Sequence, residues 1–365
     1  MRILLDARLY GLQHRGLGRY LMELVRNLLA LAQRDEFIFL VAPQAVKEFP
    51  PLPTFVSLRE APWRVYSLAE QVKLPRLIAQ LRPDLVHFPH FSAPFFCPVP
   101  FVVTVHDLIL HHAPTERSTT LPTPLYWLKV AAYHRLMRRL LQQARAVMTV
   151  SQAVAADLNH YYPFVSNKLR VIPLAPSPLP PASQYQSPHP YFLMVGAFYP
   201  HKNVERAVVA VAALRQKQPQ VELWLVGKVD AFGLRLQNWV HEQGWSNWVR
   251  FWGSVSDVEL AALLRGSTGY LLPSLHEGFG LGALDALAVG VPVVAADIPV
   301  LREVLGPAAL YADPYHTQAI ADQLLRLATH PELRIELTSQ AKHWLERYSW
   351  ARTGAQTLAL YHEIN

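Results

Sequence analysis

The chain has 365 residues, of which 51% are hydrophobic and 17% charged, and its formal net charge is +7. This composition excludes an intrinsically disordered chain, and the single cysteine, Cys97, excludes a disulfide framework, a zinc finger and an iron–sulfur cluster. The length predicts two domains, because a single core rarely grows beyond about 250–300 residues.

The first half of the chain alternates apolar strands with helical patterns. The predicted strands are residues 3–5, 37–41, 85–88, 101–105, 146–150 and 169–172. A loop containing glycine follows the first strand. The predicted helices between the strands include residues 19–31, 126–143 and 153–159. This order of strand, loop, helix and strand indicates a parallel sheet.

Residues 171–190 interrupt this pattern with seven prolines. Proline fixes φ and removes a backbone donor, so the stretch continues neither a helix nor a central strand. We interpret it as a linker. The expected domains are therefore residues 1–175, a linker of residues 176–190, residues 191–345, and a terminal helix of residues 346–365 that crosses back to the first domain.

The alternation restarts after the linker. The predicted strands are residues 191–195, 222–226, 249–252, 270–272, 291–295 and 309–311, with helical patterns between them. Both halves are thus predicted to be α/β, with doubly wound Rossmann-like sheets. Such sheets bind ligands beyond the carboxyl ends of their strands, so the expected site is the cleft between the two domains.

The most informative segment runs from Ser274 to Asp285, where a strand, a glycine-rich turn and a helix follow one another. Backbone N–H groups at a helix start attract anions, and glycines let a phosphate approach the main chain. Glu277 precedes the turn and Asp285 lies eight residues later, so each can accept hydrogen bonds from hydroxyl groups such as a ribose diol. An ordinary turn with solvated acids has the same spacing, but the glycines around Phe279 favour a binding site.

A second motif, with His201 and Lys202, stands just before a predicted helix that carries Arg206. A cation there can neutralise a diphosphate leaving group. The alternative is a surface lysine beside a helix cap formed by Asn203.

Two further motifs lie in the first half. The glycines of Gly16-Leu17-Gly18 let the chain pass close to a ligand, but the full dinucleotide fingerprint is missing. His106 and Asp107 follow a strand. They are either a functional pair, or His106 is a core histidine whose ring is hydrogen-bonded to backbone. The sequence has no Asp-x-Asp motif, no Walker A loop and no G-x-S-x-G elbow. We therefore expect that no metal neutralises the ligand.

In this order, the segments resemble the retaining glycosyltransferases of family 4, which have the GT-B fold of two Rossmann-like domains. The resemblance covers nearly the whole chain and includes the segments GLGRY, VVTVHDL, VGAFYPHKN and LPSLHEGFGLGALDALAVG. The Glu-x7-Glu signature of the family appears as Glu277 and Asp285, so the second acid is shorter by one methylene. Ala197 stands where many members have a basic residue, which places more of the charge on Lys202.

The resemblance implies a donor site in the second domain. Glu277 would bind hydroxyls of the transferred sugar, and Lys202 would hold the pyrophosphate. Asp285 would bind the donor ribose. The remaining donor-binding residues expected there are His201, Arg206, Phe279, Gly280 and Leu281.

The resemblance also implies that the first domain binds the acceptor and contributes further site residues. His106 would line the transferred sugar near the reacting centre, as a catalytic residue beside Lys202 and Glu277. Gly16 and Leu17 would close on the phosphates. Retention would follow if the leaving diphosphate takes the acceptor proton, whereas an inverting enzyme would need a carboxylate base, for which Asp107 is the candidate.

The implied function is transfer of a hexose from a GDP- or UDP-sugar to a hydroxyl of a glycan or lipid-linked acceptor. Mannose and glucose are the leading candidates for the hexose. No cofactor, no metal and no nucleic-acid partner are expected. Two alternatives stay open: a nucleotide-sugar epimerase of the same fold, and a non-catalytic protein that binds a nucleotide sugar.

The positive charge is concentrated in residues 1–175, which sum to +9, whereas residues 176–365 sum to −2. In the predicted helix of residues 126–145, Tyr133 and Met137 share an apolar face and Arg138 and Arg139 an opposite, basic face. Such a helix can lie on an anionic membrane surface, although a packed helix with a solvated face is the alternative.

The sequence predicts no transmembrane segment, because its uncharged stretches are interrupted by prolines. Asp6 and Arg8 likewise interrupt the apolar N-terminus that a signal peptide needs. We therefore expect a cytoplasmic protein, with peripheral binding at the inner membrane face as a further expectation.

Overall fold

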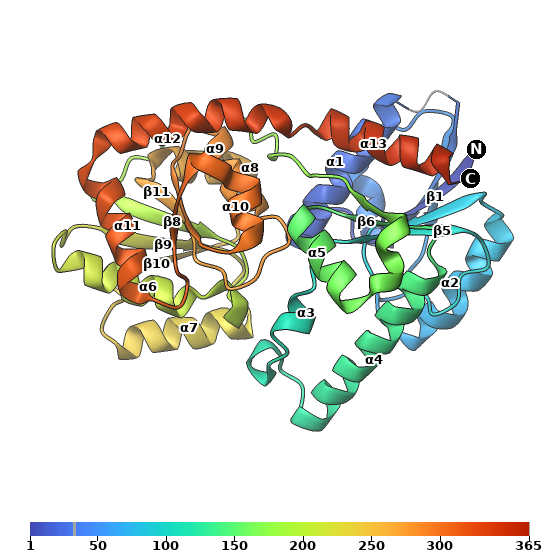
Figure 1. Ribbon diagram of the computed structural model, residues 1–365, viewed down its shortest axis with the longest axis horizontal. Helices are drawn as coiled ribbons and strands as arrows, with labels where there is room; N and C mark the ends of the chain where they lie inside the picture. The colour runs from blue at the N-terminus through green and yellow to red at the C-terminus, as the bar shows by residue number, and fades with distance from the viewer. Residues whose placement is uncertain (32–33, 365) are drawn as a thin grey trace. The chain divides into compact units, whose positions relative to one another are not determined.

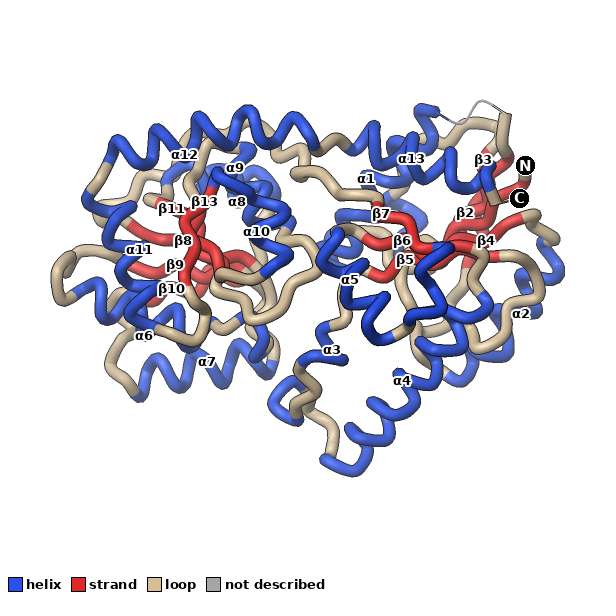
Figure 2. Tube along the Cα trace, in the orientation of Figure 1, coloured by secondary structure: helices blue, strands red, loops and turns tan. Residues whose placement is uncertain are grey.

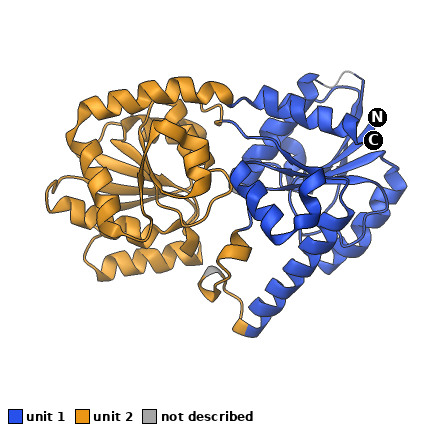
Figure 3. Ribbon diagram, viewed as in Figure 1, with its two compact units in different colours: residues 1–108, 124–175, 348–365 blue, residues 109–123, 176–347 orange. Residues whose placement is uncertain are grey.

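The computed structural model of the protein describes residues 1–31 and 34–364 (Figure 1). The chain divides into two compact units, drawn in blue and orange in Figure 3. Unit 1 comprises residues 1–108, 124–175 and 348–365, and unit 2 comprises residues 109–123 and 176–347. Residues 109–123, which the sequence analysis placed in the first domain, thus belong to unit 2.

Unit 1 is built on a parallel sheet, whose described strands have the order β3-β2-β1-β4-β5-β6-β7 (Figure 2). Their bounds are β1 Arg2–Asp6, β2 Glu36–Val41, β3 Val56–Glu60, β4 Leu85–Phe88, β5 Phe101–Val105, β6 Ala146–Thr149 and β7 Leu169–Val171. The chain moves outward from β1 in one direction and returns to its other side with β4. The topological switch point of unit 1 therefore lies between β1 and β4.

The helices of unit 1 are α1 (Arg15–Leu31), α2 (Leu68–Leu81), α4 (Thr123–Gln143), α5 (Gln152–Tyr161) and α13 (Trp350–Glu363). Helix α13 comes from the end of the chain and packs on α1, where a Cβ on Gly354 would lie 2.8 Å from the Cβ of Asn27. Its Tyr361 hydroxyl is 2.5 Å from Nδ1 of His87 on β4. The last helix is therefore an integral part of unit 1.

The start of α1 differs from the sequence prediction. The helix begins at Arg15 rather than at residue 19, so Gly16, Leu17 and Gly18 form its first turn instead of a loop. A Cβ on Gly18 would collide with the carbonyl oxygen of Gly11. Glycine at this position therefore allows the preceding loop to pack directly on the helix.

Unit 2 is built on a second parallel sheet, with the described strands in the order β10-β9-β8-β11-β12-β13. Their bounds are β8 Tyr191–Val195, β9 Glu222–Val226, β10 Val249–Gly253, β11 Gly269–Leu272, β12 Val293–Ala296 and β13 Ala309–Ala312. By the same rule, its switch point lies between β8 and β11. The prediction of two Rossmann-like parallel sheets is confirmed.

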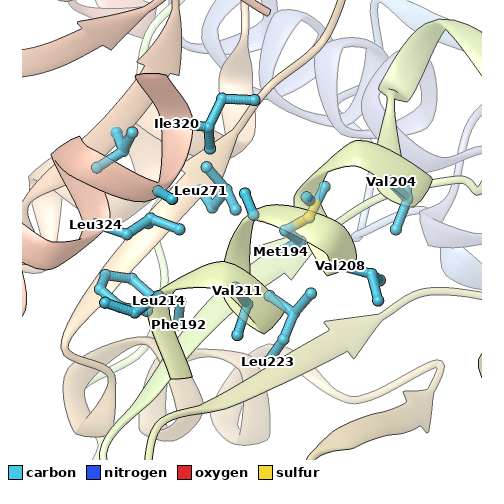
Figure 4. Close-up of a cluster of buried hydrophobic side chains, with 14 of the residues drawn as sticks. Phe192, Met194, Val204, Val208, Val211, Leu214, Leu223, Leu271, Ile320 and Leu324 are labelled. Carbon is cyan, nitrogen blue, oxygen red and sulfur yellow. The ribbon is translucent and has the colours of Figure 1, made fainter. Parts of the chain in front are cut away.

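Helices cover both faces of the second sheet. They are α6 (Val204–Arg215), α7 (Ala231–Glu242), α8 (Asp257–Gly266), α9 (Leu281–Ala288), α10 (Pro299–Leu305), α11 (Thr317–Thr329) and α12 (Pro331–Trp344). The short helix α3 (Ile109–His112) also belongs to unit 2. Phe192 and Met194 of β8 point into a core that contains Val208 and Val211 of α6 and Leu324 of α11 (Figure 4). This alternation buries every second residue of the strand on this face.

On the opposite face, α9 packs closely on β11. A Cβ on Gly282 would collide with the hydroxyl of Tyr270, so the glycine allows this approach. Residues 172–190 contain neither helix nor strand. Within the described ranges, the structure has no helix that combines the length and the apolar character needed to cross a membrane.

Candidate functional site

Two loops meet at the switch point of unit 2, one after β8 and one after β11. The N–H of Leu275 donates to the carbonyl of His201 at 2.8 Å. The side chain of Asn203 donates to the carbonyl of Pro273 at 3.0 Å. The second motif and the glycine-rich segment of the sequence analysis are therefore neighbours in space.

Lys202 and Glu277 form an ion pair between these loops, with 2.6 Å from Nζ to Oε1. Their side chains are 25% and 9% exposed. Burial acts to raise the pKa of Glu277, but the charge of Lys202 and its hydrogen bond outweigh burial and lower that pKa. The pair therefore presents an ionised carboxylate beside an ammonium group, at the edge where α/β sheets bind ligands.

Asn203 holds the Lys202 turn in place, a role that the sequence analysis missed. Its backbone is left-handed, with φ of 59°, and its side chain makes no capping hydrogen bond to α6. The buried amide instead donates to the carbonyls of Pro273 and Pro314, at 3.0 and 2.7 Å. Asparagine tolerates the left-handed region better than most residues, which is the sequence signal for such a turn.

His201 and Arg206 flank the ion pair. Burial, followed by the charge of Lys202, lowers the pKa of His201 to about 4, so its imidazole is neutral near pH 7. Arg206 donates to Oδ1 of Asn203 at 2.8 Å. Its guanidinium lies 5.5 Å from the ring centroid of Tyr315. One positive charge is thus held one helical turn beyond Lys202.

The glycine-rich turn leads directly into α9. Gly280 has φ of 87°, and a Cβ on it would lie 2.8 Å from a methyl carbon of Leu301, so both backbone and space require glycine. The side chain of Phe279 is buried. Helix α9 begins at Leu281, and the first N–H groups of any helix lack acceptors within that helix. This turn therefore offers backbone donors rather than side chains.

Asp285 has a contact that the motif does not predict. Its Oδ1 accepts the backbone N–H of Ser177 at 2.6 Å, which ties α9 to the proline-rich segment. Burial, followed by the charges of Glu277 and Asp285, raises the pKa of Tyr270. The phenol of Tyr270, a residue that the sequence analysis did not single out, therefore lies near both acids of the signature.

The remaining predicted residues belong to unit 1. His106 follows β5, and its Nε2 lies 2.9 Å from the carbonyl of Pro89. Its ring meets Tyr20 edge-on, with 4.7 Å between the centroids. Burial lowers the pKa of His106 to about 4, although the Pro89 hydrogen bond acts in the opposite direction. Gly16 is exposed and Leu17 half-buried, both in α1.

The cluster in unit 2 combines a cation, an ionised carboxylate and the backbone donors of a helix start. Such groups suit a ligand that carries both phosphate and hydroxyl groups. Among residues 1–31 and 34–364, no three His, Cys, Asp or Glu side chains gather closely enough to hold a metal ion.

Comparison with known families matches both halves of the chain. Residues 14–175 match the family model described as Glycosyltransferase Family 4. Residues 180–344 match the family model described as Glycosyl transferases group 1.

Curated relatives point in the same direction. MMP alpha-(1->4)-mannosyltransferase of Mycolicibacterium hassiacum is 32% identical over 272 residues, which cover 72% of this chain and 65% of that protein. O-antigen chain mannosyltransferase B of Escherichia coli is 25% identical over 375 residues, which cover 95% of each chain. Among solved structures, sucrose-phosphate synthase from Thermosynechococcus elongatus has a TM-score of 0.80 at 19% identity, covering 100% of this chain and 98% of that one. This likeness concerns the fold.

Proposed function

This chain belongs to the glycosyltransferases of the family 4 type, with the GT-B fold, and from that premise we propose that it transfers a hexose from a nucleoside-diphosphate sugar to a hydroxyl of a glycan or lipid-linked acceptor. Mannose is the first candidate, because two of its relatives are named mannosyltransferases, and glucose is the second. GDP and UDP are the candidate carriers. The observation that supports this proposal most is the Lys202–Glu277 pair at the switch point of unit 2.

In the proposed reaction, the bond between C1 of the hexose and the β-phosphate oxygen breaks as positive charge develops on the sugar. The acceptor oxygen attacks C1 from the same face, so the anomeric configuration is retained. The departing phosphate oxygen takes the acceptor proton. The products are the new glycoside and a nucleoside diphosphate.

Lys202 has the chemistry to stabilise the leaving group. An ammonium group has three donors, so Lys202 can keep its 2.6 Å contact with Glu277 while another N–H donates to the diphosphate. The start of α9 would add backbone donors to the same negative charge. In this proposal no metal is needed, because these groups supply the neutralisation.

Glu277 has the properties of a hydroxyl acceptor. Its carboxylate is held ionised by Lys202, and it would accept hydrogen bonds from the hexose as positive charge develops at C1. His106 of unit 1 is neutral near pH 7, and its Nε2 bonds to Pro89. We therefore assign His106 to positioning the transferred sugar rather than to carrying the proton.

The test is a transfer assay with GDP-mannose or UDP-glucose as donor and simple methyl hexopyranosides as acceptors. We expect one donor to raise the melting temperature and to yield a glycoside with the donor's anomeric configuration by NMR. Lys202→Ala should lower turnover at least about a hundredfold, while the matched variant Lys217→Ala retains it.

Each other outcome has a distinct meaning. An inverted product would end the retaining mechanism and point to a carboxylate base such as Asp107. An epimerised nucleotide sugar formed without acceptor would favour an epimerase. Donor binding without any turnover would favour a non-catalytic binding protein. Near-normal turnover of Lys202→Ala would remove the role assigned to Lys202.

We also propose that unit 1 meets an anionic lipid surface through α4. The side chains of Tyr126, Val130 and Met137 on this helix are buried. Its other side exposes large apolar residues, among them Trp127 and Leu128. Arginines follow on the same helix, and apolar side chains next to cations suit an anionic membrane surface.

A further inference from the structure

Unit 1 has a switch point of its own, between β1 and β4, to which the roles assigned so far give no ligand. The segment after β1 carries Arg8, and the segment after β4 carries His90. Open α/β sheets bind ligands where the strand order reverses, beyond the carboxyl ends of the strands. A ligand site is therefore expected at this edge of unit 1.

A buried cluster of three charged residues stands at the end of β1. The guanidinium of Arg8 donates to both carboxylate oxygens of Asp6, at 2.8 and 2.6 Å, and to Oε1 of Glu70 at 2.6 Å. All three side chains are at most 4% exposed. Burying charges costs desolvation, so such a cluster is weak support for stability and suggests a positioning role.

What this cluster positions is Tyr66. The second oxygen of Glu70 accepts the backbone N–H of Tyr66 at 2.6 Å. Tyr66 has φ of 66°, in the left-handed region that bulky residues rarely adopt. Strained backbone of this kind persists only where the surroundings hold it, and it is concentrated at functional sites.

The side chain held in this way is an aromatic ring that solvent can reach. Tyr66 is 54% exposed, and its hydroxyl end bonds to Nδ1 of His90 at 2.9 Å. Burial lowers the pKa of His90 to about 3, so this imidazole is neutral. One end of the ring is therefore fixed at the switch point, while part of the ring stays open.

The groups around Tyr66 fit a sugar. His90 packs on Phe91 with 3.9 Å between the ring centroids, and Phe91 meets Tyr133 edge-on at 5.1 Å. The charge of Asp107 acts on both Tyr66 and Tyr133, which places this carboxylate nearby. An aromatic face suits the C–H face of a pyranose, and a neutral imidazole and a carboxylate suit its hydroxyls.

We infer that Tyr66 forms the stacking platform of a pyranose subsite at the switch point of unit 1, and that this subsite takes the acceptor sugar. His90 orients the platform, and the Asp6–Arg8–Glu70 cluster holds its backbone. The assignment to the acceptor rests on the proposed transferase function. The presence of a pyranose subsite rests on unit 1 alone.

The test is saturation-transfer NMR with the methyl α-pyranosides of mannose, glucose, galactose and N-acetylglucosamine. We expect the unaltered protein to bind at least one of them. Tyr66→Asn removes the ring, and asparagine adopts a left-handed backbone readily, so the fold should persist. The saturation-transfer signal of Tyr66→Asn should fall about fivefold or more, while Tyr66→Phe should retain most of the signal.

The matched control is Tyr161→Ala, another tyrosine of unit 1 at the last residue of α5. Because α5 follows the parallel strand β6, the end of α5 lies toward the opposite edge of the sheet. Loss of the Tyr161 ring should therefore leave the saturation-transfer signal unchanged. Equal signals from Tyr66→Asn and the unaltered protein would overturn the inference, as would no binding of any of the four pyranosides.

Failure of this inference can be told apart from failure of the proposed function. Thermal stabilisation by GDP-mannose or UDP-glucose reports on unit 2 and should be the same in Tyr66→Asn as in the unaltered protein. If a donor binds and no pyranoside does, only the subsite is lost. If pyranosides bind through Tyr66 and no donor does, the subsite stands and its assignment to an acceptor fails.

Discussion

Asp285 is a single residue whose two carboxylate oxygens can serve different partners. One oxygen accepts the N–H of Ser177 at 2.6 Å. In the proposed function, the other oxygen would receive a ribose hydroxyl. In the proposed function, the shorter acid at this signature position would therefore connect the donor site with the proline-rich segment.

The substitution Asp285→Asn distinguishes the contact with Ser177 from the proposed hydrogen bond to the ribose. Asp285→Asn keeps a carbonyl oxygen for Ser177 but replaces the other acceptor by an NH₂ donor. We expect nucleoside-diphosphate affinity to fall about tenfold, as for loss of a charged hydrogen bond, with little change in melting temperature. Calorimetric titration should also show a smaller preference for ribonucleotides over their 2′- and 3′-deoxy forms.

The control for this prediction is Asp297→Asn, which changes an exposed carboxylate that pairs with Arg302. It should leave nucleotide affinity unchanged. If Asp285→Asn kept the full preference for ribonucleotides, the ribose role of Asp285 would be refuted.

Some residues of the site could be predicted from sequence and others could not. Lys202 and Glu277 stand in motifs with glycines and a helix start, and the structure pairs them. Asn203 stands beside Lys202 in the same motif, but the motif does not predict its contacts, and Tyr66 stands in no such motif. Their left-handed backbones depend on partners distant in sequence, Pro273 and Pro314 for Asn203, and Glu70 with its ion pair to Arg8 for Tyr66.

Among the elements, the sequence predicts buried strands better than exposed ones. The predicted strands all appear, with small shifts in their ends. Strand β3 was not predicted, because its residues VSLRE form a partly exposed edge strand without an apolar run. Helix α2 was not predicted either, and it contains Pro75, which normally interrupts a helix. Local sequence patterns therefore predict the elements that have a regular apolar run or face.

The exposed side chains of helix α4 predict binding to anionic vesicles. The protein should co-sediment with vesicles that contain phosphatidylserine and not with phosphatidylcholine vesicles. The double variant Trp127→Ser, Leu128→Ser should lose most of the binding, because it removes exposed apolar area. Lys129→Gln with Arg135→Gln should weaken binding and reduce its dependence on salt.

Ile335→Ser is the matched control for the apolar change, since Ile335 is an exposed apolar residue on α12 of unit 2. Binding equal to that of the unaltered protein is expected. Equal sedimentation with both kinds of vesicle, or none with either, would contradict the proposed membrane surface.

At the scale of the whole molecule, four histidines predict sensitivity to acid, of which His87 is buried and His90, His106 and His201 are half-buried. Burial lowers the pKa of His87 and His90 to about 3 and that of His106 and His201 to about 4. Unfolded histidine titrates near about 6.5. Between that pH and the folded pKa values, the unfolded chain binds protons that the folded chain does not. The free energy of unfolding is therefore highest above the pKa of unfolded histidine, and it falls as the pH drops from there toward the folded pKa values.

Urea denaturation at pH 7, 6 and 5 measures this effect. Each of these histidines should contribute up to about 1.4 kcal/mol per pH unit to the loss of unfolding free energy. His106→Asn should reduce the slope by about one proton. The exposed His343 offers a control, because His343→Gln should leave the slope unchanged. Equal unfolding free energies at pH 7 and pH 5 would contradict the prediction.

The packing of α13 on α1 has a consequence for biosynthesis. A ribosome makes the strands of unit 1 before unit 2, yet Gly354 and Tyr361, which contact Asn27 and His87, are made only after unit 2. The nascent first unit must therefore wait, with its α1 surface uncovered, until almost all of the described chain has emerged. A stop codon before α13 would therefore leave unit 1 incomplete, even though all of its strands had been made.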